Sequence, residues 1–254
     1  MIKGLILDLD GTVYLGKKSV PGAARFVTRM KKRGIRCLFV TNRANRTPKE
    51  IRTHLKKMGI DCKNADILTA AEATVRHIGK GSVYCIGEKG IIGEIRKQGL
   101  VMNDRKPDSV IVSFDRSFSY AKLLKACQLI HAGSKFIATN PDKGLKTDDG
   151  IYPGTGAMLA AVESCTGVKP IVIGKPGRLI VDMALKKLNL SKKEVLMVGD
   201  NIETDIVAGK RAGVRTALLL TGISKRSDLR KSRVKPTWTA NNYAELEKVL
   251  NGIA

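Results

Sequence analysis

The stretch IKGLILDLDGT, residues 2–12, runs from an apolar segment into two carboxylates and a glycine. Residues 2–9 have the composition of a buried strand. Because side chains alternate along a strand, Asp8 and Asp10 should start on one face, and Gly11 then lets the chain turn sharply. Both acids can therefore face one ligand. An isolated Asp-x-Asp triplet is also common in solvated turns, so the rest of the chain must decide between these interpretations.

Apolar, strand-like runs alternate with stretches of helical spacing along the chain. This alternation is typical of a parallel sheet covered by helices on both faces, and it predicts an α/β fold with a Rossmann-like core. The expected strands are residues 2–9, 36–41, 82–86, 109–114, 135–139, 170–173, 194–198 and 215–220. The expected helices are residues 21–33, 48–58, 70–78, 120–132, 156–164, 179–188 and 203–212.

Polar groups follow several of these strands, at the edge of a parallel sheet where ligands bind. They are Asp8 with Asp10, Thr41 with Asn42, Lys175, and Asp200 with Asp205. The strands between about residues 80 and 168 are followed by loops of another character. We therefore expect a core formed by residues 1–78 and 169–254, with a smaller α/β domain inserted at 79–168.

Composition excludes several classes of protein. A chain of 254 residues, 43% of them hydrophobic, can bury a full core. No run reaches the roughly 20 apolar residues of a membrane span, and the N-terminus lacks a signal-peptide pattern, so we expect no membrane partner and a cytoplasmic location. The five cysteines are scattered, and the three histidines lack a partner at ligand spacing. The cysteines should be reduced, and any metal should be bound by oxygen.

The formal charge of +23 is consistent with a nucleic-acid partner, an anionic small substrate or a lysine-rich surface. Basic pairs recur along the whole chain, which favours solvated helix faces. Nucleic-acid binders concentrate charge in one stripe and often add stacking aromatics, whereas aromatics are 4% of this chain. Nucleic acid is therefore disfavoured as a partner. The densest cluster of basic residues, at 225–235, is a candidate anion-binding patch. Attraction of a phosphorylated substrate is the simpler explanation of the positive charge.

Each polar strand end has a plain structural explanation when taken singly, as a helix cap, a loop lysine or a tight turn. Four such strand ends in this order along the chain are difficult to explain by coincidence. The chain resembles haloacid dehalogenase (HAD) superfamily phosphatases, whose four motifs correspond here to Asp8-Leu9-Asp10-Gly11-Thr12, Thr41-Asn42-Arg43, Gly174-Lys175-Pro176, and Gly199-Asp200-Asn201 with Thr204-Asp205. The inserted stretch, with residues 139–142 and 150–156, resembles the α/β (C2-type) cap of the NagD-like and p-nitrophenyl phosphatase branch.

The resemblance implies a role for each motif residue. Asp8 would attack phosphorus to give an aspartyl phosphate, and Asp10 would serve as general acid and then base. Mg²⁺ and Lys175 would supply positive charge. The implied metal ligands are Asp8, the backbone carbonyl of Asp10, and Asp200, with Asn201 and Asp205 behind them. The implied substrate-binding residues are Gly11, Thr41, Asn42, Arg43, Lys175 and Asn140.

Arg43 departs from the branch, which commonly has asparagine at this position. Its charge could bind a second anionic group of the substrate, or the side chain could turn to solvent. Specificity is expected in loops of the inserted domain, because such a domain can exclude water and contact the leaving group. Candidates are Asp115, Arg116, Asn140, Asp142, Lys146 and the turn at 154–156, whose amides could hold an anion or only cap a helix.

The predicted function is Mg²⁺-dependent hydrolysis of a small phosphorylated metabolite. No residue identifies a particular substrate. The possible substrates therefore include sugar phosphates, phosphoglycolate, nucleotides, pyridoxal phosphate and p-nitrophenyl phosphate. Two alternatives also stay open: a non-catalytic protein of the same fold that binds anions or nucleic acid, and a phosphotransferase. A homodimer is consistent with the resemblance, since relatives often pair through their caps.

Overall fold

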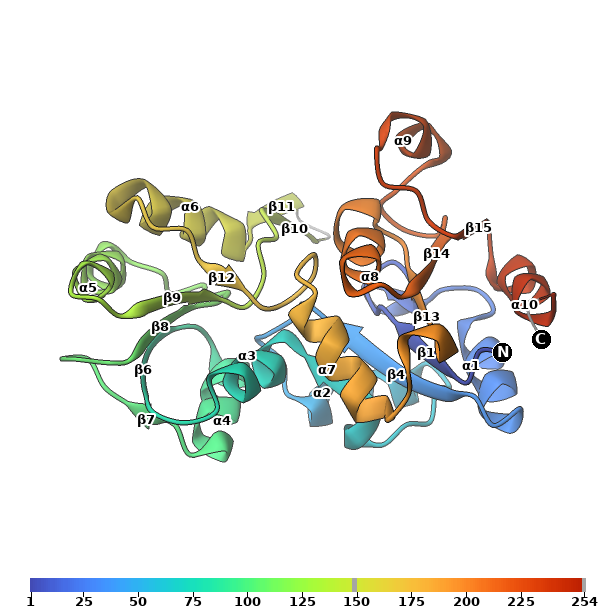
Figure 1. The fold of residues 1–254 in the computed structure, drawn as a ribbon, viewed down its shortest axis with the longest axis horizontal. Helices are drawn as coiled ribbons and strands as arrows, with labels where there is room; N and C mark the ends of the chain where they lie inside the picture. The colour runs from blue at the N-terminus through green and yellow to red at the C-terminus, as the bar shows by residue number, and fades with distance from the viewer. Residues whose placement is uncertain (148–149, 253–254) are drawn as a thin grey trace. The chain divides into compact units, whose positions relative to one another are not determined.

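A computed structural model describes residues 1–147 and 150–252, without the side chains of residues 145–147 (Figure 1). The described chain divides into two compact units. The first contains residues 1–41 and 48–68 and resumes at Lys175, and the second contains residues 42–47 and 69–174. The second unit is thus longer than the expected insertion at 79–168. No helix in the described ranges is long and apolar enough to cross a membrane.

The first unit is built on a six-stranded sheet with strand order β15-β14-β13-β1-β4-β5. Its strands are β1 (Gly4–Leu7), β4 (Arg36–Thr41), β5 (Ile67–Thr69), β13 (Val195–Gly199), β14 (Arg215–Leu219) and β15 (Trp238–Ala240). Strand β1 lies at the centre, where it pairs in parallel with β13 on one side and β4 on the other. The carboxyl ends of these three strands are therefore neighbours.

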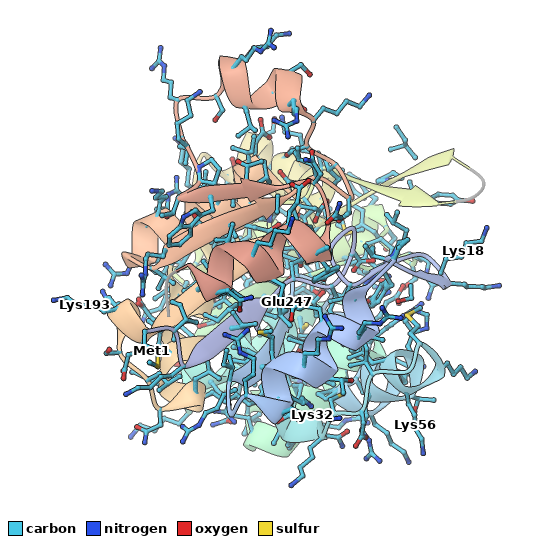
Figure 2. The ribbon with its side chains drawn as sticks, turned by 90° about the vertical axis from the view of Figure 1, so that its right-hand side faces the viewer. Met1, Lys18, Lys32, Lys56, Lys193 and Glu247 are labelled. Atoms are coloured by element: carbon cyan, nitrogen blue, oxygen red, sulfur yellow. The ribbon has the colours of Figure 1, made fainter. Side chains whose placement is uncertain are left out.

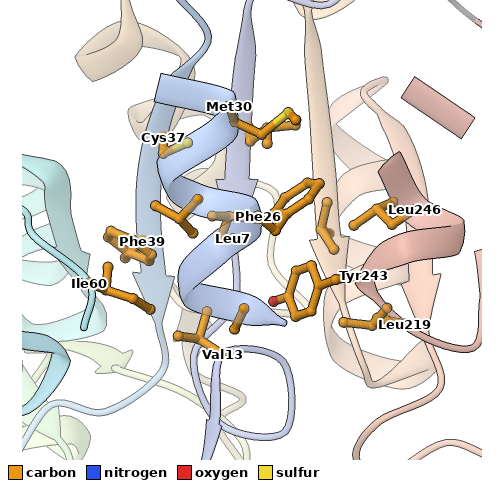
Figure 3. Close-up of a cluster of buried hydrophobic side chains, with 14 of the residues drawn as sticks. Leu7, Val13, Phe26, Met30, Cys37, Phe39, Ile60, Leu219, Tyr243 and Leu246 are labelled. Carbon is orange, nitrogen blue, oxygen red and sulfur yellow. The ribbon is translucent and has the colours of Figure 1, made fainter. Parts of the chain in front are cut away.

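Helices cover both faces of this sheet. The helices of this unit are α1 (Ala23–Lys32), α2 (Pro48–Lys57), α7 (Leu179–Leu188), α8 (Val207–Ala212), α9 (Arg226–Lys231) and α10 (Tyr243–Asn251), of which α9 has no buried residue. The unit also contains short 3-10 turns at Asn64–Asp66 and Lys192–Glu194, a π-helical turn at Ile202–Ile206, and a small hairpin of β2 (Tyr14–Leu15) and β3 (Lys18–Ser19). Helix α1 buries Phe26, Val27 and Met30 at helical spacing. Figure 3 shows Phe26 beside Tyr243 of α10, in the core that packs on Leu7, Phe39 and Leu219 of the sheet.

The second unit has its own parallel sheet, with strand order β12-β9-β8-β6-β7. Its strands are β6 (Ser82–Ile86), β7 (Val101–Met102), β8 (Ser109–Val112), β9 (Lys135–Ala138) and β12 (Ile171–Val172), and its helices are α3 (Ala70–Ile78), α4 (Lys89–Gln98), α5 (Tyr120–His131) and α6 (Thr155–Thr166). The strands β10 (Gly144–Thr147) and β11 (Gly150–Pro153) form an antiparallel pair. Helices α3 and α4 share one core, and α5 and α6 share another.

The expected α/β fold is confirmed, and most expected elements are present within a few residues. The expected core boundary at residue 169 assigns the strand at 170–173 to the first unit, and the structure differs at this point. The counterpart of that strand, β12, pairs with β9 in the second unit. A two-residue strand carries no periodicity that could tell the sheets apart.

Charged side chains are spread over the first unit. Lys18, Lys32, Lys56 and Lys193 project outward from separate elements (Figure 2). The five cysteines are free, and three of them are buried packing residues. Exposed lysines on separate elements therefore contribute to the positive charge of this unit.

Candidate active site

The chain turns back immediately after the first acidic pair. Strand β1 ends at Leu7, and the backbone N–H of Asp8 donates to the Val198 carbonyl at 2.9 Å, which continues the pairing with β13. Asp8 is buried. Asp10 lies beyond the strand, is half-buried, and forms an isolated backbone β-bridge with Tyr14. Gly11 has φ 89°, a left-handed value that favours glycine. The sharp turn expected at Gly11 is therefore present.

The Gly11 amide is used within this turn, because its N–H donates to the Tyr14 carbonyl at 2.7 Å. This contact argues against a role for the Gly11 amide in the substrate binding that the resemblance implies for this residue. Gly11 instead allows a close approach: a Cβ there would lie 2.3 Å from Oδ2 of Asp200. We therefore remove Gly11 from the candidate phosphate ligands and assign it to the packing of the loop on Asp200.

Lys175 joins two of the acids from a buried position. Its ammonium donates to Oδ1 of Asp8, to Oδ1 of Asp205 at 2.7 Å, and to the Val40 carbonyl at 3.5 Å. Its relative exposure is only 3%. Burial alone lowers the pKa of Lys175, but the carboxylates of Asp205 and Asp8 raise it well above its ordinary value. Lys175 is therefore a permanent cation at neutral pH.

Asp200 follows β13 and is held by neighbours on two loops. The Thr12 hydroxyl donates to its Oδ1 at 3.2 Å, and the Ile223 N–H donates to its Oδ2 at 2.7 Å. A Cβ at Gly222 would lie 2.0 Å from that same Oδ2, so a side chain there would displace the carboxylate. The orientation of Asp200 is thus set by the loops that follow β1 and β14.

Asp205 and Asn201 lie at the π-helical turn that follows β13. Asp205 Oδ2 accepts from the Asn201 N–H at 3.1 Å, while the Asn201 side chain accepts from the Glu203 N–H at 2.9 Å and caps the turn. One Asp205 oxygen therefore fixes its own loop and the other holds Lys175.

The buried acids carry more negative charge than Lys175 can balance. Carboxylate oxygens of Asp8, Asp200 and Asp205 all lie within 4.8 Å of one another. Burial raises the pKa of Asp8, and Asp205 and Asp200 raise it further against the opposing effect of Lys175. Burial, followed by the charge of Asp205, raises the pKa of Asp200 to about 6. Three hard oxygen donors around one lysine are suited to a divalent cation that prefers oxygen.

Thr41 ends β4 and is buried, and the chain then passes into residues 42–47 of the second unit. The Asn42 amide donates to both oxygens of Asp142, at 3.3 and 3.1 Å. Asn140 donates to the Asn42 carbonyl at 2.9 Å and to the Thr139 hydroxyl at 3.4 Å. Both of these contacts of the Asn140 amide nitrogen hold neighbouring protein groups, which argues against the assignment of Asn140 to substrate.

Other candidates in the second unit are engaged in local contacts. Asp115 is paired with Lys122 at 2.6 Å, and Arg116 is paired with Glu88 at 2.6 Å. In the turn at 154–156, the N–H of Gly154 donates to the Lys143 carbonyl and that of Gly156 to the Asp142 carbonyl. Those amides close the turn and do not offer an anion site. The Lys146 side chain lies outside the described part of the structure.

Two residues that brace the site were not expected from the sequence. The Tyr243 hydroxyl donates to the Thr12 carbonyl at 2.9 Å, and the Thr221 hydroxyl donates to the Gly11 carbonyl at 2.7 Å. Thr221 follows β14 closely, so the rule that polar groups gather after strands could have found it. Tyr243 lies on α10, and nothing in the sequence placed it near Thr12.

A parallel α/β sheet whose central strand ends in buried acids, paired through a buried lysine, is the arrangement expected of a HAD-type hydrolase. Residues 5–101 match the family model described as haloacid dehalogenase-like hydrolase, and residues 172–246 match a HAD-hydrolase-like model. The chain belongs to this family.

Relatives with named activities resemble the chain over nearly its whole length. It is 40% identical over 247 residues to the 5'-nucleotidase YutF of Bacillus subtilis (96% of each chain) and 38% identical over 255 residues to the acid sugar phosphatase of Staphylococcus aureus (97% of this chain and 98% of the relative).

Two solved structures share the fold. NagD from E. coli superposes with a TM-score of 0.91 at 35% identity, covering 96% of this chain and 98% of NagD. The 4-nitrophenylphosphatase of Thermotoga maritima superposes with a TM-score of 0.92 at 34% identity, covering 97% of both chains. The chain is therefore an enzyme, a HAD-type phosphatase of the NagD-like kind.

Proposed function

We propose that this chain is a Mg²⁺-dependent phosphatase that hydrolyses small phosphomonoesters through an aspartyl phosphate on Asp8. One observation carries the proposal: the buried Lys175 ammonium contacts both Asp8 and Asp205, and the carboxylate of Asp200 lies beside them. A carboxylate needs nearby positive charge to attack a dianionic phosphate. The site supplies part of that charge next to the proposed nucleophile.

The reaction takes place in two displacements. A carboxylate oxygen of Asp8 forms a bond to phosphorus while the bond from phosphorus to the leaving oxygen breaks, and Asp10 protonates that oxygen. Asp10 then accepts a proton from water, the water oxygen bonds to phosphorus, and the Asp8–phosphorus bond breaks. Lys175 stays protonated throughout and holds Asp8 in position. The half-buried position of Asp10 beyond the strand suits a group that exchanges protons with water.

Asp8, the backbone carbonyl of Asp10, and Asp200 would hold Mg²⁺, with Asp205 and Asn201 fixing the loop behind them. Bound there, Mg²⁺ supplies the positive charge that the three carboxylates leave unbalanced and that a phosphate requires. The raised pKa values of Asp8 and Asp200 support this assignment, because they mark carboxylates whose charge is not yet compensated.

Phosphate oxygens are assigned to the Thr41 hydroxyl, the Lys175 ammonium, and the backbone amides of Asn42 and Arg43. Asn140 and Asp142 support these amides by holding Asn42.

The Arg43 side chain is assigned to a second anionic group of the substrate. The change Arg43→Asn should raise KM for substrates with such a group by about tenfold and leave KM for p-nitrophenyl phosphate within about twofold. Unchanged KM values for every ester would overturn this role.

The relatives named a nucleotidase, a sugar phosphatase and a 4-nitrophenylphosphatase support a small phosphorylated metabolite as substrate. We assign contact with the leaving group to residues of the second unit, which would act as the cap. The free cysteines support action in the cytoplasm, where thiols stay reduced. A panel of nucleoside monophosphates, sugar phosphates, phosphoglycolate and pyridoxal phosphate, ranked by kcat/KM, would identify the preferred class.

The two acids of the first motif provide the test. With p-nitrophenyl phosphate and Mg²⁺, Asp8→Asn should lose at least about 10³-fold in kcat and form no phosphoenzyme. Asp10→Asn should lose a comparable factor but accumulate phosphoenzyme, because the second displacement lacks its base. Acid quenching with ³²P-labelled substrate measures both.

Equal trapping in the two variants would overturn the assignment of Asp8 and Asp10. Activity that persists after chelation of divalent metals would overturn the metal requirement. Release of p-nitrophenol that requires an added acceptor alcohol, with the phosphoryl group recovered as an ester of that alcohol, would favour a phosphotransferase instead.

A further inference from the structure

A groove of about 470 Å³ lies in the first unit at the amino end of β4. It is lined by Arg36, Cys37 and Leu38 of that strand, and by residues at the ends of α1 and α7. Its volume falls in the range of small-molecule sites. Thr41 lies at the other end of β4, about 16 Å away at the rise of an extended strand. The groove is therefore separate from the acids of the active site.

The groove combines apolar surface with an excess of positive charge. Buried apolar side chains, among them Ile35 and Leu188, contribute to its lining. Its charged residues are three cations, Lys31, Arg36 and Lys187, and one acid, Asp66. Burial raises the pKa of the Cys37 thiol to about 12, so Cys37 adds no negative charge at neutral pH.

The carboxylate of Asp66 already has partners within the protein. Oδ2 of Asp66 accepts from the backbone N–H of Lys63 at 2.9 Å, which closes the turn at Asn64–Asp66. The same oxygen lies 3.8 Å from the Lys31 ammonium, a loose pairing. Asp66 therefore offsets the three cations only in part.

The cationic groups are held in place by backbone carbonyls. Lys31 donates to the Asp61 carbonyl at 2.6 Å, Arg36 to the Leu188 carbonyl at 2.6 Å, and Lys187 to the Ile67 carbonyl at 2.8 Å. A carbonyl positions an ammonium or guanidinium group without cancelling its charge, since the carbonyl is neutral. Positioning in advance lowers the side-chain entropy lost when a ligand binds.

We propose that this groove is a second ligand site, for a small molecule that carries a phosphate or phosphonate dianion on an apolar body. The dianion is bound by Lys31, Arg36 and Lys187, and the apolar body packs on the side of Ile35 and Leu188. The groove contains neither a carboxylate suited to attack phosphorus nor the triad of acids, so the ligand is held and not hydrolysed.

Phenylphosphonate is a suitable probe, because its carbon–phosphorus bond resists phosphomonoester hydrolysis and its ring supplies an apolar body. Titration into the full chain, with EDTA present to suppress metal binding, is followed by NMR at backbone amides. The expected result is a saturable shift at the amides of Arg36, Cys37 and Lys187, at concentrations up to about 10 mM. The absence of saturable shifts at these three amides would overturn the proposal.

A matched pair of variants separates a built site from general positive charge. Lys31→Gln with Lys187→Gln should weaken binding at the groove by about tenfold or more, while shifts near Asn42 stay unchanged. The control, Lys192→Gln with Lys193→Gln, removes two exposed charges outside the lining and should weaken binding by less than about twofold. Equal weakening in both would overturn the proposal. The single variant Lys31→Gln, at an exposed position, provides the same comparison if the double variant folds poorly.

Discussion

The buried acids at the carboxyl ends of the strands have different electrostatic surroundings in the two parallel sheets. In the six-stranded sheet, Asp8 and Asp200 lie beside Asp205, and Lys175 pairs with Asp8 and Asp205. In the five-stranded sheet, Asp115 lies after β8, where its carboxylate accepts from Lys122 at 2.6 Å and from the Ser117 hydroxyl and amide. Similar strand ends thus bear acids in two different electrostatic states.

The pKa values follow this difference. Burial and neighbouring acids raise the pKa of Asp200 to about 6. Burial also opposes ionisation of Asp115, but hydrogen bonds from Lys122 and Ser117 lower its pKa overall. A buried acid with a lowered pKa is accounted for by its own surroundings, whereas acids held at raised pKa values call for an external cation.

The largest expected contrast comes from removing the lysine on each side. Lys175→Met leaves Asp8 and Asp205 buried without a cation, so the metal-free protein should lose about 3–5 kcal/mol of unfolding free energy and nearly all activity. Lys122 is about one third exposed. Lys122→Met should therefore cost only about 1 kcal/mol and leave kcat/KM within about twofold. Urea unfolding in EDTA and p-nitrophenyl phosphate hydrolysis measure the two effects, and equal losses would remove the distinction between the sheets.

Neutralising one acid in each sheet should change stability in opposite directions. The pKa of Asp200 is raised from 3.8 to about 6, so its ionisation destabilises the metal-free fold progressively as pH rises between these values, and the whole penalty applies at neutral pH. Asp200→Asn should remove this penalty and raise the unfolding free energy by about 1–2 kcal/mol at neutral pH in EDTA. Below about pH 4 the substitution should not raise the unfolding free energy. Activity should be lost. Asp115→Asn should instead cost about 1–3 kcal/mol and retain activity. Thermal melts across pH would contradict this if Asp200→Asn were destabilising at neutral pH.

The smallest expected effect tests the bracing of the first motif by α10. Tyr243→Phe removes only the hydrogen bond to the Thr12 carbonyl, so we expect a loss of about 1 kcal/mol in stability. If that bond positions Asp8 and Asp10, kcat should fall about three- to tenfold while KM changes less than about twofold. An unchanged kcat with the same loss of stability would reduce Tyr243 to a packing residue.

The fold was predictable where periodicity is strong and failed where long-range contacts decide. Strand β4 and helices α3 and α7 match the expected bounds. Helix α4 was not expected, since Gly90 and Gly93 interrupt its pattern. Gly90 is required by a distant segment, because a Cβ there would lie 2.4 Å from the Ala44 carbonyl. Helix α10 could have been found, since its buried residues Tyr243, Leu246 and Leu250 recur at helical spacing.

The candidate site was predictable in its ionic residues and not in its supporting contacts. Asp8 and Asp200 follow adjacent strands, so the strand-end rule placed them together. Lys175 contacts Asp8 and Asp205 by a route the sequence did not reveal, since the strand before Lys175 belongs to the other sheet. The Gly11 amide and Asn140 were assigned to substrate because the sequence cannot show which donors already have partners inside the protein.

The pairing of β1 with β13 also has a consequence for the order of events during synthesis. Asp8 is synthesised about 190 residues before its pairing partner Val198 and the acids Asp200 and Asp205. Until then, one edge of β1 has no partner strand, and Asp8 has neither Lys175 nor the other acids beside it. An N-terminal fragment that ends before β13 should therefore be both inactive and prone to pair its open edge with other chains.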